Sequence, residues 1–323
     1  MLLTKENSFL YIMVKIGDLA FEQDVFLGPM AGYTDYPFRK ICKKYGAVLT
    51  YTEMVSAKAL YYGDKKTKKL LVREDGNTAV QLFGREPEIM AYAAKMLEDE
   101  GVKIVDINMG CPAPKITSNG EGSSLLKEPD VAVAIAKSVK DAVKIPVTVK
   151  VRRGWDCCPD AVFDISKMLD DVGVDAVCIH PRTREQFYSG KADWNVIKQV
   201  KENVSCTVIG NGDITSYVDY IKMKEETGCD AVMIAREACS RPWIFKECSV
   251  GHNIDVDFAE RLDIIKYNYE LALEFYGEYT AVTQMRKQFH CYIKGLPGAA
   301  KLKDGINRIY TYNEVMNFLN SLK

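Results

Sequence analysis

The loop at 105–112, with the sequence V-D-I-N-M-G-C-P, holds the residue types best suited to chemistry. An amide, Asn108, stands three residues before a thiol, Cys111, where an apolar run gives way to a turn. Gly110 relaxes the backbone before the thiol, and Pro112 removes a donor and fixes the exit from the turn. A thiol beside a rigid turn is accessible to a ligand, which makes Cys111 a candidate for chemistry on that ligand.

The elements that could position such a loop are eight apolar runs separated by amphipathic stretches. The runs lie at 25–30, 47–53, 79–84, 103–108, 146–151, 175–180, 206–211 and 230–235, and helical spacing appears at 87–100, 129–142, 159–173 and 215–227. Strands that alternate with helices predict parallel βαβ units. Eight consecutive units favour an α/β fold of the closed (β/α)8 TIM barrel type, for which about 250 residues is typical, over a doubly wound sheet.

The chain continues beyond such a barrel. Runs of the β type cease near residue 250, and helical patterns follow at 257–276, 280–294 and 312–322. Gly295, Pro297 and Gly298 interrupt the pattern after the second of these stretches. We therefore expect a barrel domain at 1–250 and a small C-terminal helical domain at 251–323.

Polar residues close most of the eight runs, at the strand ends where a (β/α)8 enzyme carries its active site. The candidates are Pro29, Met30, Ala31, Glu53, Gln81, Asn108, Lys150, Arg152, His180, Arg182, Asn211, Gly212, Asp213, Ala235 and Arg236, with Cys111 just beyond. One polar strand end is usually a loop cap, but many at one mouth indicate a site. The last two runs end in short turns before helices, where barrels commonly hold a phosphate on backbone N–H groups. We therefore expect a phosphorylated cofactor or substrate.

Several other binding motifs are missing from the sequence. No G-x-G-x-x-G follows the first run and there is no G-x-x-x-x-G-K-[ST], which disfavours dinucleotide-binding and P-loop architectures. The ten cysteines include no C-x-x-C pair, and the adjacent Cys157 and Cys158 are poorly spaced for sharing a zinc ion. We expect reduced thiols and no metal site.

The composition is that of an ordinary globular protein, 47% hydrophobic and 27% charged, with a net charge of −1. No run approaches the roughly 18 apolar residues that span a bilayer, and the first residues lack the features of a signal peptide. These features predict a cytoplasmic protein with no membrane contact, as a monomer or weak dimer. Met13 is a possible alternative start, which would leave the first twelve residues as a loose extension.

Basic residues gather in two segments despite the nearly neutral total. Residues 58–73 and 286–308 each contain six lysines or arginines and one aspartate. One such segment is most simply a solvated helix face. Two of them in a neutral protein favour a polyanionic partner.

The motifs as a set resemble those of the tRNA-dihydrouridine synthases, flavoenzymes that reduce uridine in tRNA. The resemblance runs from about residue 25 to about 310 and is strongest with the bacterial B-like branch. It is carried by G-P-M-A-G-Y-T-D-Y-P-F-R (28–39), V-Q-L-F-G (80–84), D-I-N-M-G-C-P with K-I-T-S-N-G-E-G-S (106–123), V-K-V-R-R-G-W-D (149–156), H-P-R-T-R-E-Q-F-Y-S-G-K-A-D-W (180–194), I-G-N-G-D-I (209–214), R-P-W-I-F (241–245) and M-R-K-Q-F-H-C-Y-I-K-G-L-P-G-A (285–299).

The resemblance implies an FMN cofactor across the barrel mouth, with NADPH as its reductant. Residues that would contact FMN are Pro29, Met30 and Ala31 along it, Gln81 at the ring, Lys150 and His180 on the pyrimidine side, and Asn211, Gly212, Asp213, Ala235 and Arg236 at the phosphate. A cation near the ring would stabilise the negative charge that reduction leaves there.

The resemblance also implies how uridine is reduced. Hydride from the reduced FMN would go to C6 of the uracil, and Cys111 would donate a proton to C5, since an ordinary thiol with a pKa of about 8.5 stays protonated near neutrality. Residues that would contact the tRNA are Asn108 at the uracil, Arg152, Arg182 and Tyr188 near it, and Arg286, Lys287 and Lys294 in the basic segment 286–308. The base must leave its stack to enter the pocket.

Two departures from the family pattern and two alternatives remain. Ala235-Arg236-Glu237 replaces Gly-Arg-Gly or Gly-Arg-Ala at the phosphate turn, which predicts weaker FMN binding or a shifted turn. Pro181 replaces a common glycine and stiffens the loop after His180. The alternatives are another FMN-dependent barrel oxidoreductase acting on a small pyrimidine or enone, and a non-catalytic tRNA-binding chaperone.

Overall fold

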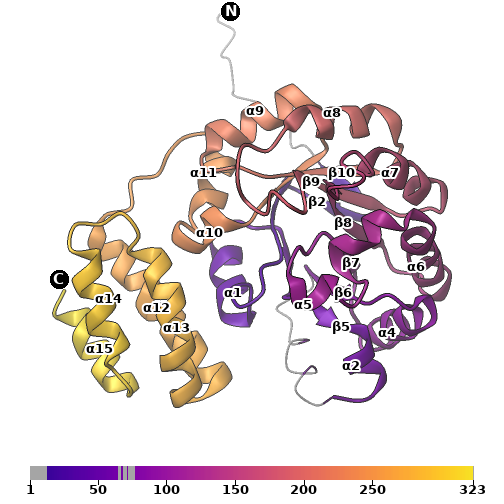
Figure 1. The fold of residues 1–323 in the computed structure, drawn as a ribbon. Helices are drawn as coiled ribbons and strands as arrows, with labels where there is room; N and C mark the ends of the chain where they lie inside the picture. The colour runs from indigo at the N-terminus through magenta and orange to yellow at the C-terminus, as the bar shows by residue number, and fades with distance from the viewer. Residues whose placement is uncertain (1–12, 65–66, 68–70, 72–76, 323) are drawn as a thin grey trace, which may run out of the picture.

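A computed structural model describes residues 13–64, 67, 71 and 77–322 of the chain (Figure 1). A barrel of parallel strands with a coat of helices occupies one side of the molecule, and the C-terminal helices stand beside it. The first twelve residues and five of the six basic residues of segment 58–73 lie outside the described residues. The expectations about a loose extension and about that basic segment therefore stay predictions.

Within the described residues, eight parallel strands close into a barrel. They are β3 (Val25–Leu27), β4 (Leu49–Tyr51), β6 (Thr78–Phe83), β7 (Val105–Met109), β8 (Val147–Gly154), β9 (Ala176–Thr183), β10 (Thr207–Asn211) and β11 (Ala231–Ile234). Pairing of β11 with β3 and of β4 with β6 completes the ring, and the two-residue strand β5 (Val55–Ser56) adds to β6. Each predicted run overlaps one of these strands, which confirms the predicted TIM barrel.

The two-residue period of the strands explains how polar side chains reach the mouth. In β9, Ala176 and Cys178 belong to the apolar cluster inside the barrel, whereas Val177 and Ile179 pack outward with the surrounding helices. The next inward positions along the same strand are those of His180 and Arg182. The apolar half of each strand therefore fills the barrel, and the polar residues follow at its C-terminal end.

The surrounding helices begin where prolines and capping side chains predict. The helices around the barrel are α1 (Tyr36–Lys44), α2 (Ala57–Tyr61), α4 (Pro87–Asp99), α6 (Pro129–Ala142), α7 (Val162–Asp171), α8 (Trp194–Asn203), α9 (Tyr217–Thr227) and α11 (Ile244–Val250). Three further helices, α5 (Pro114–Thr117), η1 (Gly122–Lys127) and α10 (Arg236–Ser240), lie in the described loops. Proline opens α4 and α6, and the side chains of Asp35 and Ser216 cap α1 and α9.

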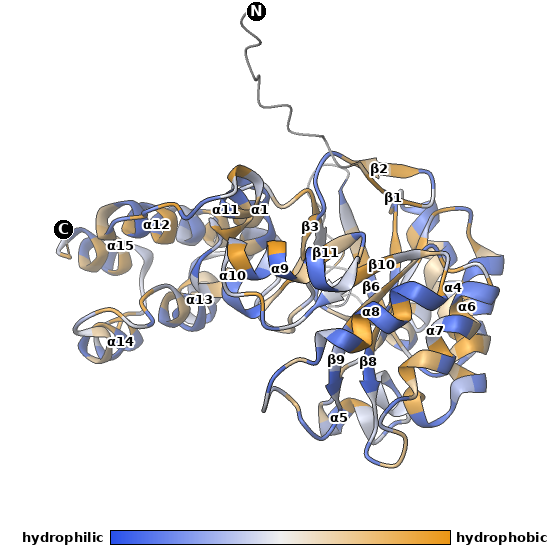
Figure 2. Ribbon diagram, turned by 90° about the horizontal axis from the view of Figure 1, so that it is seen from above, coloured by the Kyte–Doolittle hydropathy of each residue, from blue (hydrophilic) through white to orange (hydrophobic). Residues whose placement is uncertain are grey.

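A short antiparallel hairpin, which the sequence did not predict, precedes the barrel. Its strands are β1 (Val14–Ile16) and β2 (Leu19–Phe21). Val14, Ile16 and Phe21 join the apolar cluster inside the barrel, and Thr207 Oγ1 donates to the carbonyl of Lys15 at 2.6 Å. Because Thr207 begins β10, the hairpin lies at the N-terminal end of the barrel, as Figure 2 shows.

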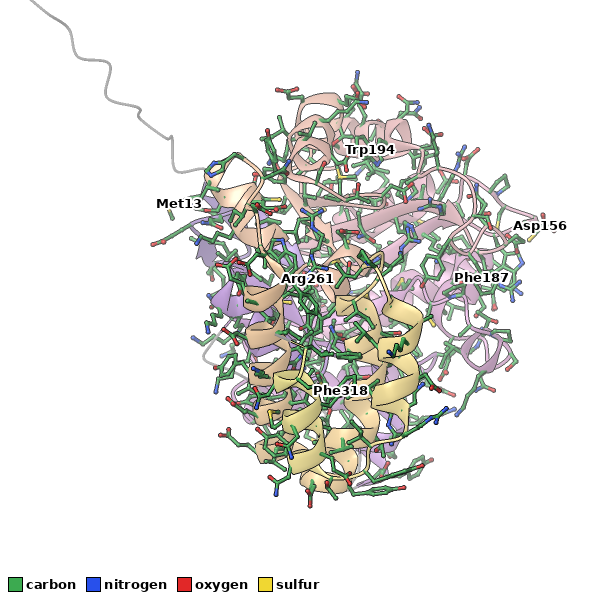
Figure 3. The ribbon with its side chains drawn as sticks, turned by 90° about the vertical axis from the view of Figure 1, so that its left-hand side faces the viewer. Met13, Asp156, Phe187, Trp194, Arg261 and Phe318 are labelled. Carbon is green, nitrogen blue, oxygen red and sulfur yellow. The ribbon has the colours of Figure 1, made fainter. Side chains whose placement is uncertain are left out.

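Four further helices follow the barrel: α12 (Phe258–Tyr276), α13 (Glu278–Tyr292), α14 (Ala299–Asn307) and α15 (Tyr312–Asn320). They share an apolar core of their own, and Phe318, labelled in Figure 3, packs against it with its ring centre 6.3 Å from that of Phe289. Sequence patterns predicted α12, α13 and α15 but missed α14, whose start at Gly298 and internal Gly305 resemble a loop. No helix in the described part of the chain has the length and apolar character of a bilayer span.

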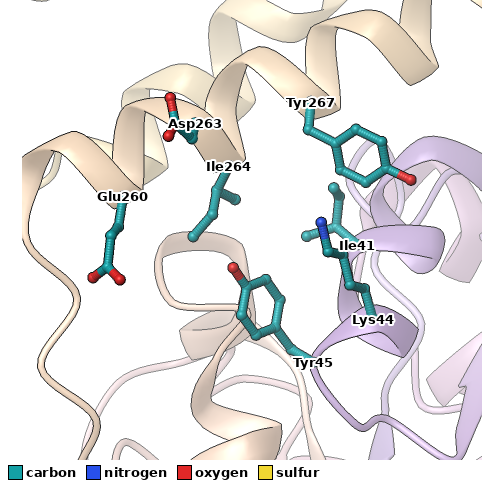
Figure 4. A pocket seen from close by; sticks show the side chains of 7 residues that line it. All are labelled: Ile41, Lys44, Tyr45, Glu260, Asp263, Ile264 and Tyr267. Atoms are coloured by element: carbon teal, nitrogen blue, oxygen red, sulfur yellow. The ribbon is translucent and has the colours of Figure 1, made fainter.

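The C-terminal helices pack on α1 of the barrel. Ile41 of α1 belongs to their core, and Tyr36 stacks on Phe275 of α12 at 5.0 Å. The Tyr276 hydroxyl donates to Asp35 at 2.9 Å. Between α1 and α12 lies a cavity of about 240 Å³, shown in Figure 4 with its lining residues Ile41, Lys44, Tyr45, Glu260, Asp263, Ile264 and Tyr267. The C-terminal helices are therefore held next to the barrel mouth, because α1, on which they pack, follows the C-terminal end of β3.

Candidate active site

A cavity of about 790 Å³ opens at the C-terminal ends of the barrel strands, within the range of ligand sites. The predicted residues that line it are Pro29, Met30, Ala31, Gln81, Asn108, Cys111, Lys150, Arg152, His180, Tyr188, Asn211, Gly212, Asp213, Ala235, Arg236 and Lys294. The last of these comes from the segment after α13, so the cavity is bounded by the barrel and by the C-terminal helices. Arg182, Arg286 and Lys287 are not among its lining residues.

A buried chain of hydrogen bonds holds the cysteine loop. Asp106 accepts from Thr148 Oγ1 at 2.5 Å and from Gln81 Nε2 at 2.6 Å, and Gln81 Oε1 accepts from Asn108 Nδ2 at 2.8 Å. The free oxygen of Asn108 then accepts the backbone N–H groups of Gly110 at 3.2 Å and Cys111 at 2.9 Å. Asn108 therefore shapes the loop that carries the thiol, in addition to lining the cavity.

In its ionised form Asp106 only accepts hydrogen bonds, and this fixes the direction of the chain. The side chain is fully buried, and burial raises its pKa to about 7, against the lowering effects of Thr148, Gln81 and the charge of Lys150. The amide nitrogen of Gln81 is turned to Asp106, so its oxygen faces Asn108. One hydrogen on that nitrogen and one lone pair on that oxygen remain for a ligand.

Cys111 lies on a loop whose backbone is tied from two sides. Its carbonyl accepts the Ser123 hydroxyl at 2.9 Å and the Ser123 N–H at 3.0 Å. Gly122, at φ +61°, lies against the Cys111 loop, and a Cβ on it would be 2.8 Å from the Cys111 carbonyl oxygen. Only glycine avoids this close contact. Burial raises the pKa of the Cys111 thiol, with smaller opposing effects from the Ala113 N–H and from Arg152. The thiol is therefore protonated at neutral pH, as a proton donor must be.

Lys150 supplies a positive charge at the cavity and His180 does not. The Lys150 ammonium donates to Asn211 Oδ1 at 2.9 Å, and Asn211 in turn donates to the carbonyl of Met233 at 2.8 Å, which locks that amide. Burial lowers the pKa of Lys150. The pKa of His180 lies well below its usual value because of burial and then the charges of Lys150 and three arginines, so its imidazole is neutral near pH 7.

The turn after β10 has a strained backbone that its contacts hold in place. Gly212 has φ +131°, and a Cβ there would lie 3.0 Å from Ala192 and 3.2 Å from His180. Asp213 has φ +58°, an uncommon value for a residue with a side chain. Its carboxylate accepts from Arg182 Nη2 at 2.7 Å and from Arg236 Nη2 at 3.1 Å, which explains why this conformation persists.

The departure at Ala235-Arg236-Glu237 is accommodated. Ala235 has φ −121°, so its Cβ causes no left-handed strain at this turn. The Glu237 carboxylate accepts from Arg241 at 3.3 Å, which partly neutralises its charge. These contacts remove the backbone reason for expecting weaker cofactor binding, and the affinity itself stays a prediction.

Two buried arginines at the barrel mouth, Arg152 and Arg182, hold the loop after β9. Arg152 donates to the carbonyls of Gly110 at 2.8 Å, Thr183 at 3.0 Å and Phe187 at 2.8 Å. Arg182 donates to the carbonyls of Ser189 and Gly190, at 3.1 and 2.7 Å, and is only 1% exposed. The predicted substrate contacts of both arginines stay predictions, but the partners found here give them a loop-holding role first.

Tyr188 stands exposed on that loop between two guanidinium groups. Arg236 lies 4.7 Å and Arg152 5.6 Å from its ring centre. The preceding residue, Phe187, has φ +48° and projects at the edge of the molecule in Figure 3. An aromatic ring held by cations at a cavity entrance suits contact with a planar, negatively charged ligand such as a nucleotide.

The three predicted residues of the basic segment 286–308 have different surroundings. Lys294 lines the cavity, and the Lys287 ammonium lies 5.5 Å from the ring of Tyr33, which also lines it. Arg286 donates to the carbonyl of Ile309 at 2.7 Å and covers the ring of Tyr310. Arg286 therefore stabilises the packing of the C-terminal helices, whereas Lys287 and Lys294 face the barrel mouth.

Sequence reasoning missed several residues that line the cavity. They include Tyr33, Met54, Phe187, Cys239 and Cys291. Tyr33 and Phe187 lie inside motifs that were recognised, so a closer reading of those motifs could have found them. Cys291 also lies inside a recognised motif, at 285–299, whereas Cys239 does not, and the two come together only through the docking of α13 on α10.

Comparison with known proteins gives a consistent picture. The family described as dihydrouridine synthase (Dus) matches residues 26–323. The chain is 39% identical over 305 residues to a probable tRNA-dihydrouridine synthase of Rickettsia conorii, covering 91% of this chain and 92% of the relative. It is likewise 39% identical to tRNA-dihydrouridine synthase B of Vibrio vulnificus, covering 92% and 94%.

Solved structures share the fold at low sequence identity. Histamine dehydrogenase from Rhizobium sp. 4-9 superposes with a TM-score of 0.59 at 16% identity, covering 82% of this chain and 51% of that one. Morphinone reductase gives a TM-score of 0.53 at 14% identity, covering 78% and 92%. At such identities the likeness concerns the barrel alone.

Proposed function

The chain belongs to the dihydrouridine synthase family, in its bacterial B-like branch, and we propose that it reduces the C5=C6 bond of specific uridines in tRNA. FMN is the proposed cofactor and NADPH the proposed reductant. The observation that carries the proposal is the Cys111 thiol, held by a buried hydrogen-bond chain in the same cavity as Lys150.

The residues around the cavity fit FMN. Gln81 and Asn211 offer amides, Lys150 an ammonium group and Arg236 a guanidinium group near the turns after β10 and β11. This donor set suits a ring that becomes anionic on reduction at one end and a phosphate at the other. When bound, FMN would supply the hydride chemistry at C6 of the uracil, with NADPH as the source of the reducing equivalents.

The chain's own part in the reaction is to hold and deliver a proton. Hydride addition at C6 leaves negative charge toward C5, and a neutral thiol is the form that can protonate that carbon. The Asn108 amide fixes the backbone N–H groups around Cys111, which orients the thiol, while Arg152 holds the preceding carbonyl. The neutral imidazole of His180 adds a hydrogen-bonding group without a second charge beside Lys150.

The RNA would be held where the barrel mouth meets the C-terminal helices. In this proposal the barrel, residues 1–250, performs the reduction and residues 251–323 bind the tRNA. Lys287 and Lys294 supply positive charge at that margin, and Tyr188 offers a ring for stacking on a base. The protein would meet this substrate in the cytoplasm.

The proposal is tested by deleting the gene and measuring nucleosides from bulk tRNA by mass spectrometry. We expect dihydrouridine to be lost at particular tRNA positions and restored by the wild-type gene. An unchanged dihydrouridine content in a strain that has no second enzyme of this family would contradict the proposal. It would favour a barrel oxidoreductase that acts on a small pyrimidine or enone.

A further inference from the structure

Two thiols from different parts of the fold meet at the edge of the cavity. Cys239 lies on α10, directly after the turn at Ala235-Arg236, and Cys291 lies in the last turn of α13. Both line the cavity, and Cys291 packs against the apolar cluster to which Cys239 belongs, so that each thiol influences the pKa of the other. The Cys239 thiol also donates to Met30 Sδ at 3.8 Å. Gln288 Nε2 also donates to the carbonyl of Cys239 at 3.0 Å, so α13 is docked on α10 at this point.

The surroundings of the pair favour a thiolate on Cys291. Hydrogen bonds from Cys239 and Tyr33 and the charges of Lys294 and Lys303 lower the pKa of Cys291, although burial opposes them. Cys239 keeps its proton, because its hydrogen bond to Cys291 and burial raise its pKa. A thiolate that lines an open cavity and touches a second thiol has the arrangement of a redox-sensitive cysteine with its resolving partner.

We propose that Cys239 and Cys291 form a reversible disulfide that links α10 of the barrel to α13 of the C-terminal helices. The oxidant is a hydroperoxide, with hydrogen peroxide as the simplest case. The Cys291 thiolate attacks one peroxide oxygen, the O–O bond breaks, and the hydroxide released takes a proton to become water. Cys239 then attacks the sulfenic sulfur, the S–S bond forms, and a second water leaves. Two thiols lose two electrons and two protons, and one peroxide becomes two waters.

The disulfide between Cys239 and Cys291 changes the entrance of the cavity. Two thiol sulfur atoms that are not covalently bonded lie well beyond the S–S bond length of about 2.05 Å, so the disulfide draws α13 toward α10. Lys294 lies three residues after Cys291 and Arg236 three residues before Cys239, and both line the cavity. The oxidised protein therefore has a narrower and stiffer entrance between the barrel and the C-terminal helices. The consequence that less tRNA enters rests on the proposed function, whereas formation of the bond does not.

The experiment must distinguish the Cys239–Cys291 disulfide from two other reactions of nearby thiols. Cys157 and Cys158 are adjacent, with their sulfur atoms 3.9 Å apart and Cys157 exposed, so they offer peroxide another target. Cys42 is fully buried and close enough to influence Cys239, which makes it the competing partner inside the fold. The test therefore uses full-length protein carrying Cys157→Ser and Cys158→Ser, in which peptide mapping identifies the partner of Cys239.

In that protein, hydrogen peroxide should produce one new cross-link, seen by mass spectrometry as a peptide joining Cys239 to Cys291 with two hydrogens lost. Dithiothreitol should reverse it. Adding Cys291→Ser should abolish the cross-link, and adding Cys206→Ser, a half-buried thiol at the start of β10, should leave it unchanged. Recovery of Cys239 as a free or irreversibly oxidised thiol, or in a bridge to Cys42, would overturn the proposal.

The effect on RNA is measured on the same samples. Filter binding of tRNA and dihydrouridine formation should both fall at least severalfold on oxidation and return with dithiothreitol, with no such cycle in the Cys291→Ser protein. A mapped disulfide with unchanged tRNA binding would overturn the narrowing of the entrance but not the bond. Failure of the reduced protein to form dihydrouridine would instead contradict the proposed function.

Discussion

Replacing Arg152 by methionine should both destabilise the protein and impair the cysteine loop. The guanidinium is 2% exposed and donates three hydrogen bonds to backbone carbonyls, one in the Cys111 loop and two in the loop that carries Tyr188. Methionine has a similar apolar stem and cannot donate, so the variant removes these bonds with little change in packing.

The change in unfolding free energy caused by Arg152→Met follows from two opposing contributions, the lost hydrogen bonds and the removed cost of burying a charge. Hydrogen bonds from a charged donor contribute roughly 1.5–3 kcal/mol each, or about 4.5–9 kcal/mol for three. Burial lowers the pKa of Arg152 from 12.5 to about 10, which corresponds to a cost of about 3 kcal/mol for keeping the charge buried. The net loss of unfolding free energy is therefore about 1–6 kcal/mol. With an unfolding entropy near 2.1 cal/mol/K per residue, a loss of about 3 kcal/mol lowers Tm by about 4 °C.

Thermal unfolding and steady-state kinetics with tRNA measure this prediction. We expect a lower Tm and a lower kcat, because the Cys111 loop loses a tether. Arg153→Met is the matched control, since Arg153 is a neighbour on the same strand that forms only surface ion pairs with Asp160 and Asp193. A variant at 152 with unchanged Tm and kcat and a raised, salt-dependent KM would refute the loop-holding role and indicate a direct contact with RNA phosphate.

Four further outcomes are expected. The rate of dihydrouridine formation should not decline as the pH rises from 7 to 8, because burial raises the pKa of Cys111 and the protonated thiol is the active form; a decline over that interval in single-turnover assays would contradict this. Lys150→Ala should weaken flavin binding, measured as loss of the yellow absorbance after gel filtration, and full retention of flavin would remove Lys150 from the cofactor site. Lys287→Glu combined with Lys294→Glu should weaken tRNA binding steeply in filter assays, and raised salt should do the same to the wild type. Arg286→Glu should mainly lower Tm, because Arg286 bonds to the carbonyl of Ile309, and a purely RNA-binding defect would contradict that assignment.

The barrel was predictable because strand and helix signals alternate along 25–250 and each apolar run is bounded by turn residues. The hairpin at Val14–Phe21 was not, because three-residue strands are too short to show a periodic pattern. Helix α14 was missed for a related reason, since glycines at its start and near its end resemble loop punctuation. Short elements stabilised by tertiary contacts leave little trace in a local pattern.

The sequence predicted which residues lie at the strand ends that form the site. It did not predict the direction in which their side chains point. The sequence placed Arg152 and Arg182 near the mouth, but only the fold shows that carbonyls of the loop after β9 take up their guanidinium groups. Asp106 was overlooked as part of the chain that holds Asn108, because its partners Gln81 and Thr148 come from neighbouring strands. Such cross-strand contacts depend on register, which a single sequence does not specify.

Reconstitution of the reaction tests the central claim most directly. Purified wild-type protein and the Cys111→Ala variant are each loaded with FMN and incubated with NADPH and tRNA that lacks dihydrouridine, and the nucleosides are measured by mass spectrometry. The account predicts dihydrouridine from the wild type and a rate roughly 10²–10⁴-fold lower from the variant, the span typical of general acid catalysis, with flavin content equal in both. Dihydrouridine formation at the same rate by both proteins, or by neither while a small enone is reduced, would contradict it.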